Sequence, residues 1–256
     1  MRDIIMSKLR EIEKENNIKI LYAVESGSRG WGFESKDSDY DVRFIYTHQA
    51  DWYLSIEDKK DFIEVLINSL LDINGWDIRK ALLHYKKSNP TLLEWLSSPI
   101  IYTENYCLAQ KIRDLLPDYF SAVSTIYHYL HIARSKFDDV MSTDHVKIKK
   151  YFYVLRPILA CMWIEKKNTM PPMEFSKLMA EQQLDSSLLS EIYILLNKKT
   201  SGLEIDIEPK RAIIINFLSS KIEHFEQYLK TVRRDKKSDY EDLNLLFRET
   251  LKEVWV

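Results

Sequence analysis

Two carboxylates one residue apart follow a cluster of glycines near the N-terminus, and their types and spacing suit metal chemistry. The stretch begins with Gly27-Ser28, continues for ten residues, and reaches Asp39 and Asp41 at the head of an apolar run. Side chains alternate faces along a strand, so Asp39 and Asp41 would point the same way, with Cα atoms roughly 6–7 Å apart. Carboxylates at that separation can share divalent cations. The spacing therefore predicts a metal-binding pair.

The glycines of this stretch indicate a backbone that bends tightly or approaches a ligand closely. The chain has only five glycines, and three of them are Gly27, Gly30 and Gly32. Glycine tolerates backbone conformations that other residues avoid, and it leaves room for a neighbouring group. A turn of this kind before a helix suits phosphate. Together with the carboxylate pair, it is the minimal equipment for handling a nucleoside triphosphate.

The residues of this stretch do not match three other ligand-binding motifs. Asp37, Asp39 and Asp41 resemble the start of a calcium-binding EF-hand loop, but Val42 and His48 stand where that loop needs Gly and Glu. No Gly-Lys-Ser/Thr follows the glycines, which excludes a P-loop. The glycine spacing also differs from the Gly-x-Gly-x-x-Gly of a dinucleotide-binding fold.

The bulk composition is that of a soluble globular protein. The 256 residues allow one large domain or two ordinary ones, and 45% are hydrophobic and 30% charged. With a net charge of -2, any nucleic-acid partner would need a local basic patch. The N-terminal residues are charged, so we expect no signal peptide, and no apolar run is long enough to suggest a membrane span. Cys107 and Cys161 lie far apart in the sequence, and we expect both to be reduced thiols. These features predict a cytoplasmic protein without membrane association.

Hydrophobic periodicity predicts an α+β fold with two parts. In the first part we expect strands over 18–24, 39–46 and 71–76, and helices over 2–16, 78–87 and 91–96. Thr91 is the expected N-cap of the last helix. Between the second and third strands we expect a polar loop over 47–58 and a helical or mixed segment over 61–71. From about residue 104 the pattern is helical, over 104–116, 119–137, 146–167, 173–182, 186–198, 208–232 and 236–253. We therefore predict an α/β domain with a mixed sheet over 1–103 and an all-helical domain over 104–256.

The Gly-Ser pair, the ten-residue spacing, the Asp-x-Asp pair and the flanking apolar strands resemble the DNA polymerase beta superfamily of nucleotidyltransferases. Later stretches are similar to the predicted nucleotidyltransferases found alongside RNA ligases in bacteria and phages: residues 76–82, 88–90, 93–99 and 149–157. The resemblance implies a catalytic domain over 1–103 and a helical domain over 104–256 that selects the acceptor.

The superfamily uses a third carboxylate on a neighbouring strand, and two residues are candidates for it. Asp72 leads an apolar strand, whereas Asp77 falls where a helix should begin and a carboxylate suits the helix dipole. The two have opposite strand parity, so both cannot face the metals on a regular strand. We favour Asp72, although a bulge at Gly75 would reverse the argument.

The resemblance also implies the ligands. Asp39, Asp41 and Asp72 would hold two Mg²⁺ ions, with Mn²⁺ as a substitute. Gly27 and Ser28 would bind phosphates of a nucleoside triphosphate such as ATP.

Two arginines have a second interpretation besides phosphate binding. Arg29 beside Ser28 could reach a phosphate or be a surface charge. Arg156 lies in an apolar helix, so it either pairs with a carboxylate or points at phosphate.

The predicted function is metal-dependent transfer of a nucleoside monophosphate to an acceptor hydroxyl, with release of pyrophosphate. The acceptor could be an RNA end, as in RNA repair. Two groups of basic residues are either solvated helix faces or an RNA-binding patch: Lys147, Lys149 and Lys150, and the run 233–237. The alternatives are a non-catalytic nucleotide-binding or antitoxin-like interaction protein, or an enzyme that modifies a protein or a small molecule. The nucleotide, the acceptor and the oligomeric state stay open.

Overall fold

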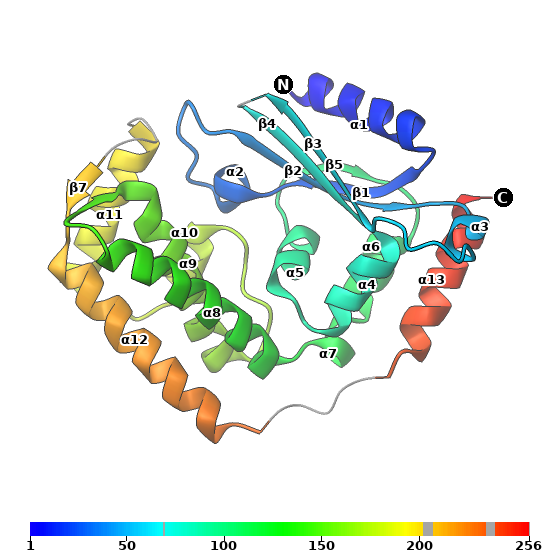
Figure 1. Cartoon of the computed structure of the whole chain (residues 1–256). Helices are drawn as coiled ribbons and strands as arrows, with labels where there is room; N and C mark the ends of the chain where they lie inside the picture. The colour runs from blue at the N-terminus through cyan, green and yellow to red at the C-terminus, as the bar shows by residue number, and fades with distance from the viewer. Residues whose placement is uncertain (69, 202–206, 234–238, 256) are drawn as a thin grey trace. The chain divides into compact units, whose positions relative to one another are not determined.

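The chain forms two compact units in the computed structural model, which describes residues 1–68, 70–201, 207–233 and 239–255 (Figure 1). The first unit contains residues 1–30 and 39–120 and the C-terminal helix α13 (Glu241–Val254). The second contains residues 31–38 and the chain from Ser121 through helix α12 (Ala212–Thr231). Residues 31–38, which lie between the Gly-Ser pair and Asp39, therefore belong to a different unit from the residues on either side of them.

A five-stranded mixed sheet forms the centre of the first unit. Its strand order is β3-β4-β2-β1-β5, with β2 and β4 parallel and the other neighbours antiparallel. The strands are β1 (Lys19–Glu25), β2 (Tyr40–Thr47), β3 (Phe62–Asn68), β4 (Leu71–Asp77) and β5 (Ile101–Glu104). The predicted mixed sheet and the α+β class are confirmed.

One face of the sheet is covered by the helix α1 (Arg2–Asn16). Its apolar stripe of Ile5, Leu9 and Ile12 is buried in one cluster with residues of β1, β2 and β4 such as Phe44. Gly75 on β4 makes room for that ring, because a Cβ there would lie 2.2 Å from a Phe44 ring carbon. Burial of apolar surface is worth about 25 cal/mol per Å², so this cluster stabilises the packing of α1 on the sheet.

Short helices complete the first unit: α2 (Gly27–Trp31), α3 (Ala50–Tyr53), α4 (Ile78–Lys86), α5 (Pro90–Leu96), α6 (Leu108–Asp114) and α7 (Leu116–Tyr119). The expected N-cap of α5 was wrong. Asn89 caps this helix by accepting the Thr91 N–H at 2.9 Å, and Pro90 occupies the first turn, where its missing N–H costs nothing.

The second unit is helical apart from a two-stranded sheet. Its helices besides α12 are α8 (Ala122–Met141), α9 (Ile148–Lys167), α10 (Phe175–Ala180) and α11 (Ser186–Ser201), and its strands are β6 (His145–Lys147) and β7 (Ile207–Pro209). Among the residues that the structure describes, no helix combines the length and the apolar character that crossing a membrane requires.

Some local expectations differ from the structure. The segment predicted as helical or mixed is the edge strand β3, which pairs antiparallel with β4 over its described length. Strands β5, β6 and β7 were not expected, because three or four residues give too short a pattern to read. The helix expected over 236–253 begins at Glu241, and the start of that prediction lies outside the described residues.

The compact units also divide the chain differently from the predicted boundary after residue 103. Helix α6 packs on β1, and α13 packs on α4 and α6, so both belong to the first unit. In the opposite direction, residues 31–38 join the second unit through aromatic contacts: the Phe33 ring lies 4.9 Å from that of Phe152 and 5.4 Å from that of Phe175.

Candidate active site

The turn at Gly27 lies directly against the carboxylate of Asp41. Gly27 has a φ of 61°, and a Cβ on it would lie 2.0 Å from Asp41 Oδ2. The neighbouring Ser26 N–H donates to the Asp41 backbone oxygen at 2.8 Å. Glycine is therefore required here twice, for the left-handed backbone and for the close approach of the carboxylate.

The parallel pairing of β2 and β4 places Asp72 beside Asp41. The two residues are register partners, and the pairing runs without a shift from Tyr40 and Leu71 to Tyr46 and Asp77. Burial raises the pKa of Asp41, the nearby Arg43 guanidinium lowers it, and the charges of Asp39 and Asp72 raise it. Asp39, one residue before β2, and Asp72 thus both act electrostatically on Asp41.

Asp77 lies on the opposite face of β4 and caps a helix. Burial alternates along β4, and the regular register shows no bulge at Gly75. Asp77 is buried, accepts the Arg79 N–H at 2.8 Å as the N-cap of α4, and accepts the Tyr53 hydroxyl at 2.6 Å. Burial raises the pKa of Asp77 to about 6. Its contacts are those of a structural cap.

Asp72 and Asp77 should therefore respond differently to substitution. We expect Asp72→Asn to lose transfer activity as Asp39→Asn does, whereas Asp77→Asn retains activity and changes the free energy of unfolding by about 0.3–1 kcal/mol, because asparagine also caps helices. Steady-state kinetics and urea denaturation of both variants test this. An inactive, stably folded Asp77→Asn beside an active Asp72→Asn would reverse the assignment.

Arg43 bridges the two neighbouring carboxylates. Its Nη2 donates to Asp41 Oδ1 and to Asp72 Oδ2, each at 2.9 Å, and its Nη1 donates to the Val42 backbone oxygen at 3.0 Å. Arg43 was missed from the sequence, although it shares strand parity with Asp39 and Asp41. Charge-assisted bonds of this kind hold both carboxylates in place.

The carboxylates have the right chemistry for a hard cation. Mg²⁺ prefers oxygen ligands and is commonly held by one or two carboxylates plus substrate phosphates. In the described part of the chain, no three or more His, Cys, Asp or Glu side chains are grouped as a metal site. The Arg43 guanidinium pairs with one oxygen of Asp41 and one of Asp72. The residues fit a divalent metal that competes with this ion pair.

This competition gives a prediction for Arg43. We expect Arg43→Ala to bind Mn²⁺ at least ~3-fold more tightly than the wild type, about 0.7 kcal/mol, because a positive charge leaves the site. Arg43→Lys, which keeps the charge, is the matched control. Electron paramagnetic resonance of free Mn²⁺ measures the affinity. Weaker binding by Arg43→Ala would mean that Arg43 only positions the ligands.

Glu25 supports Asp41 from the core. The side chain is fully buried at the end of β1, and its Oε1 accepts the Asp41 N–H at 2.8 Å while Oε2 accepts the Tyr102 hydroxyl. The Glu25 backbone oxygen accepts the Ser98 hydroxyl at 2.6 Å. Burial raises the pKa of Glu25 to about 7, although both side-chain hydrogen bonds oppose the shift. No local pattern in the sequence indicates Ser98 or Tyr102.

The raised pKa of Glu25 predicts a pH-dependent stability. Because the folded pKa lies above the ordinary value of 4.5, Glu25 contributes stability that is lost as the pH rises from about 4.5 to about 7. We therefore expect Glu25→Gln to gain about 1–3 kcal/mol relative to the wild type between pH 5 and pH 8. Urea denaturation at pH 5, 6, 7 and 8 measures the difference, and parallel pH profiles for the two proteins would contradict the shift.

The two arginines predicted to bind phosphate lie in different units. Arg29 donates from Nε to the Asp39 backbone oxygen at 3.0 Å, and its guanidinium carbon lies 3.8 Å from the centre of the Tyr40 ring. Arg156 on α9 is buried in the second unit, donates to the Met173 backbone oxygen at 3.3 Å, and lies 4.7 Å from the Trp31 ring. A phosphate-binding role for either stays a prediction.

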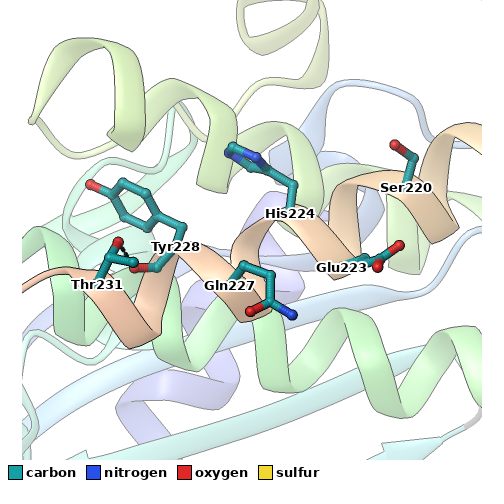
Figure 2. A pocket seen from close by; sticks show the side chains of 6 residues that line it. All are labelled: Ser220, Glu223, His224, Gln227, Tyr228 and Thr231. Atoms are coloured by element: carbon teal, nitrogen blue, oxygen red, sulfur yellow. Dashed lines mark hydrogen bonds between the residues drawn. The ribbon is translucent and has the colours of Figure 1, made fainter.

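A hollow of about 530 Å³ lies along α12. Its lining residues are far in the sequence from Asp39, Asp41 and Asp72. Figure 2 shows its lining side chains, all from α12: Ser220, Glu223, His224, Gln227, Tyr228 and Thr231. His224 pairs with Glu165 of α9 at 2.7 Å, which joins the two helices. This hollow contains none of the predicted site residues, and we assign it no chemistry.

A mixed sheet with neighbouring carboxylates on parallel strands, beside a glycine turn, is typical of nucleotidyltransferases. The family model described as RlaP, RNA repair pathway DNA polymerase beta family, matches residues 1–249. The chain therefore belongs to this family of the polymerase beta superfamily, and the resemblance found in the sequence is confirmed.

Two further comparisons found similar proteins. It is 48% identical over 255 residues to the "Uncharacterized protein YcgL" of Bacillus subtilis (strain 168), which covers 100% of this chain and 98% of that protein. A crystal structure of a nucleotidyltransferase-like protein from Exiguobacterium sibiricum 255-15 aligns with 14% identity and a TM-score of 0.32, over 87% of this chain and 75% of that one.

Proposed function

We propose that the protein is a metal-dependent nucleotidyltransferase that moves a nucleoside monophosphate from a nucleoside triphosphate to an acceptor hydroxyl. The observation that supports this most strongly is the position of the Asp41 carboxylate. It lies against the backbone of Gly27 at the start of α2 and faces Asp72 across parallel strands. A phosphate on this turn would lie beside the carboxylates, as transfer chemistry needs.

In this proposal, each group has a role in binding or orientation. The N–H groups of Gly27 and Ser28 and the Ser28 hydroxyl bind the β- and γ-phosphates. Asp39, Asp41 and Asp72 would hold two Mg²⁺ or Mn²⁺ ions, which would supply charge neutralisation for the triphosphate and lower the pKa of the attacking hydroxyl.

The surrounding residues hold these groups for an in-line displacement that releases pyrophosphate. Glu25, through its bond to the Asp41 N–H, fixes the start of β2. Arg29, stacked on Tyr40, fixes the backbone at Asp39. Catalysis would then come from positioning and electrostatic stabilisation, as is general for phosphoryl transfer.

For the acceptor we propose an RNA end. The description of the family as an RNA repair pathway family supports this choice. The net charge of -2 gives no overall attraction to RNA, so the proposal requires a local binding site.

A labelling survey tests the proposed function. The protein is incubated with Mg²⁺, each of the four NTPs labelled at the α-phosphate, and pools of RNA, protein or small molecules. We expect label on RNA with at least one NTP and none with Asp39→Asn. Label on protein or on a small molecule would replace RNA as the acceptor. Binding of NTP without transfer to any pool would support a non-catalytic protein.

A further inference from the structure

A second hollow, of about 270 Å³, lies at one end of the α8 and α9 pair in the second unit. Four of its lining residues are lysines: it is lined by Lys136, Asp139, Lys147, Lys149, Lys150 and Tyr153. We call it the lysine hollow. Residues from the end of α8, from β6 and from the first turns of α9 meet here, so the fold gathers cations that are separated in the sequence.

The lining of the lysine hollow contains more cationic than anionic side chains. Four ammonium groups share the lining with one carboxylate, and Lys136 lies 3.9 Å from Asp139 in a weak exposed pair. Within the described residues, neither Lys147 nor Lys150 makes an ion pair, and Lys150 is half-buried. Like charges brought together in a partly desolvated hollow repel each other, so an anion bound there would relieve that repulsion.

The start of α9 adds to this positive field. Lys147 is the N-cap of α9 and provides no side-chain hydrogen bond to the first turn. The first N–H groups of a helix lack partners within the helix, and the helix dipole places positive charge at this end. Lys149 and Lys150 lie in that first turn, so lysine and backbone charges act on the same space.

Tyr153 distinguishes a nucleic acid from other anions. Its side chain lines the lysine hollow one turn beyond Lys149, and the residue is 37% exposed. Its ring meets the Trp31 ring edge-on at 6.0 Å, which limits its movement. A positively charged groove with an aromatic ring is the combination that binds single strands, with phosphates on the lysines and a base on the ring. An anionic membrane surface would instead suit a flat or convex patch.

We propose that the lysine hollow binds the backbone of a single-stranded nucleic acid, which is the acceptor strand of the transfer reaction. The proposal rests on the proposed function for the role of the strand, but strand binding can be measured without any transfer. The ligand class is a polyanion with stacking bases, because four ammonium groups and one aromatic ring line the same hollow.

Fluorescence anisotropy with a labelled oligouridine in about 0.1 M KCl tests this. We expect the double variant Lys147→Ala/Lys150→Ala to bind at least ~10-fold more weakly than the wild type. Each lost phosphate contact should also reduce the slope of log affinity against log salt by about 0.7. The control is Lys221→Ala/Lys230→Ala on α12, which removes the same charge from the same unit. Equal losses in both double variants, or no loss in either, would overturn the proposal.

Further measurements separate the other outcomes. The variant Lys147→Gln/Lys150→Gln replaces the alanine pair if thermal unfolding shows that the latter is destabilised. Tyr153→Leu should weaken oligouridine more than inorganic phosphate. Binding of anionic lipid vesicles in preference to RNA would overturn the proposal. Transfer to RNA with an unchanged KM in the lysine variant would also overturn it and leave the proposed function intact. Lysine-dependent RNA binding without any transfer would support the lysine hollow and contradict the proposed function.

Discussion

Asp41→Asn is expected to lower the rate of nucleotidyl transfer at least ~100-fold while the protein remains folded, and Asp39→Asn should do the same. In the proposed mechanism both residues hold the metal, and loss of such a charged ligand would remove several kcal/mol of transition-state stabilisation, where each 1.36 kcal/mol is a factor of ten in rate. Single-turnover kinetics at saturating Mg²⁺ measure the loss. Asp58→Asn, an exchange of the same type at an exposed loop position, is the control and should retain full activity.

The stability of these variants should hold or rise. Burial and the charges of Asp39 and Asp72 raise the pKa of Asp41, so its ionised form is held at a cost that neutral asparagine removes. The lost bond to Arg43 works in the opposite direction, and Arg43 keeps Asp72 as a partner. Near-normal transfer by either variant would overturn the metal-binding assignment, and global unfolding of both would show that the carboxylates are structural.

Gly27→Ala should be nearly as damaging as loss of a carboxylate, for a geometric reason. The added Cβ would lie 2.0 Å from Asp41 Oδ2, so the turn or the carboxylate must move by more than 1 Å to restore contact distance. A misplacement of about 1 Å can cost about 100-fold in rate. We expect a fall of at least ~30-fold in kcat, together with a backbone cost of about 1–2 kcal/mol for a left-handed alanine.

Gly32→Ala is the matched control for this prediction. Gly32 also has a positive φ, of 79°, but a Cβ there would meet nothing within 4 Å. Both variants therefore pay a similar backbone cost, and only Gly27→Ala displaces Asp41. The comparison requires kcat, KM and the unfolding midpoint of both proteins. Equal activity losses would mean that strain in the glycine segment, and not the contact with Asp41, explains the effect.

Local spacing drew attention to Gly27 and Asp41, which lie in contact at the turn. The parity of a strand predicts which way two carboxylates point, and the role of Asp39 stays a prediction. The parity argument also separates Asp72 from Asp77, because β4 keeps a regular register through Gly75. Short-range periodicity therefore accounts for the α+β class, and the roles of the candidate site residues stay predictions.

The contacts that local spacing missed join residues far apart in the chain. Tyr102 reaches Glu25 from β5, a strand too short to predict, and Arg43 spans from β2 to Asp72 on β4. The aromatic residues that bind residues 31–38 to the second unit come from α9 and α10. A single sequence contains no periodic signal for such pairings, so tertiary packing decides them.

The central claim is tested most directly by comparing two positions of the radioactive label in one NTP. The protein is incubated with Mg²⁺, the acceptor that the survey identifies, and the NTP labelled at either the α- or the γ-phosphate. We predict that the α-label enters the acceptor and that the γ-label is released as pyrophosphate, with neither event in Asp41→Asn. Transfer of the γ-label to the acceptor, or release of inorganic phosphate from the γ-position without transfer, would contradict a nucleotidyltransferase.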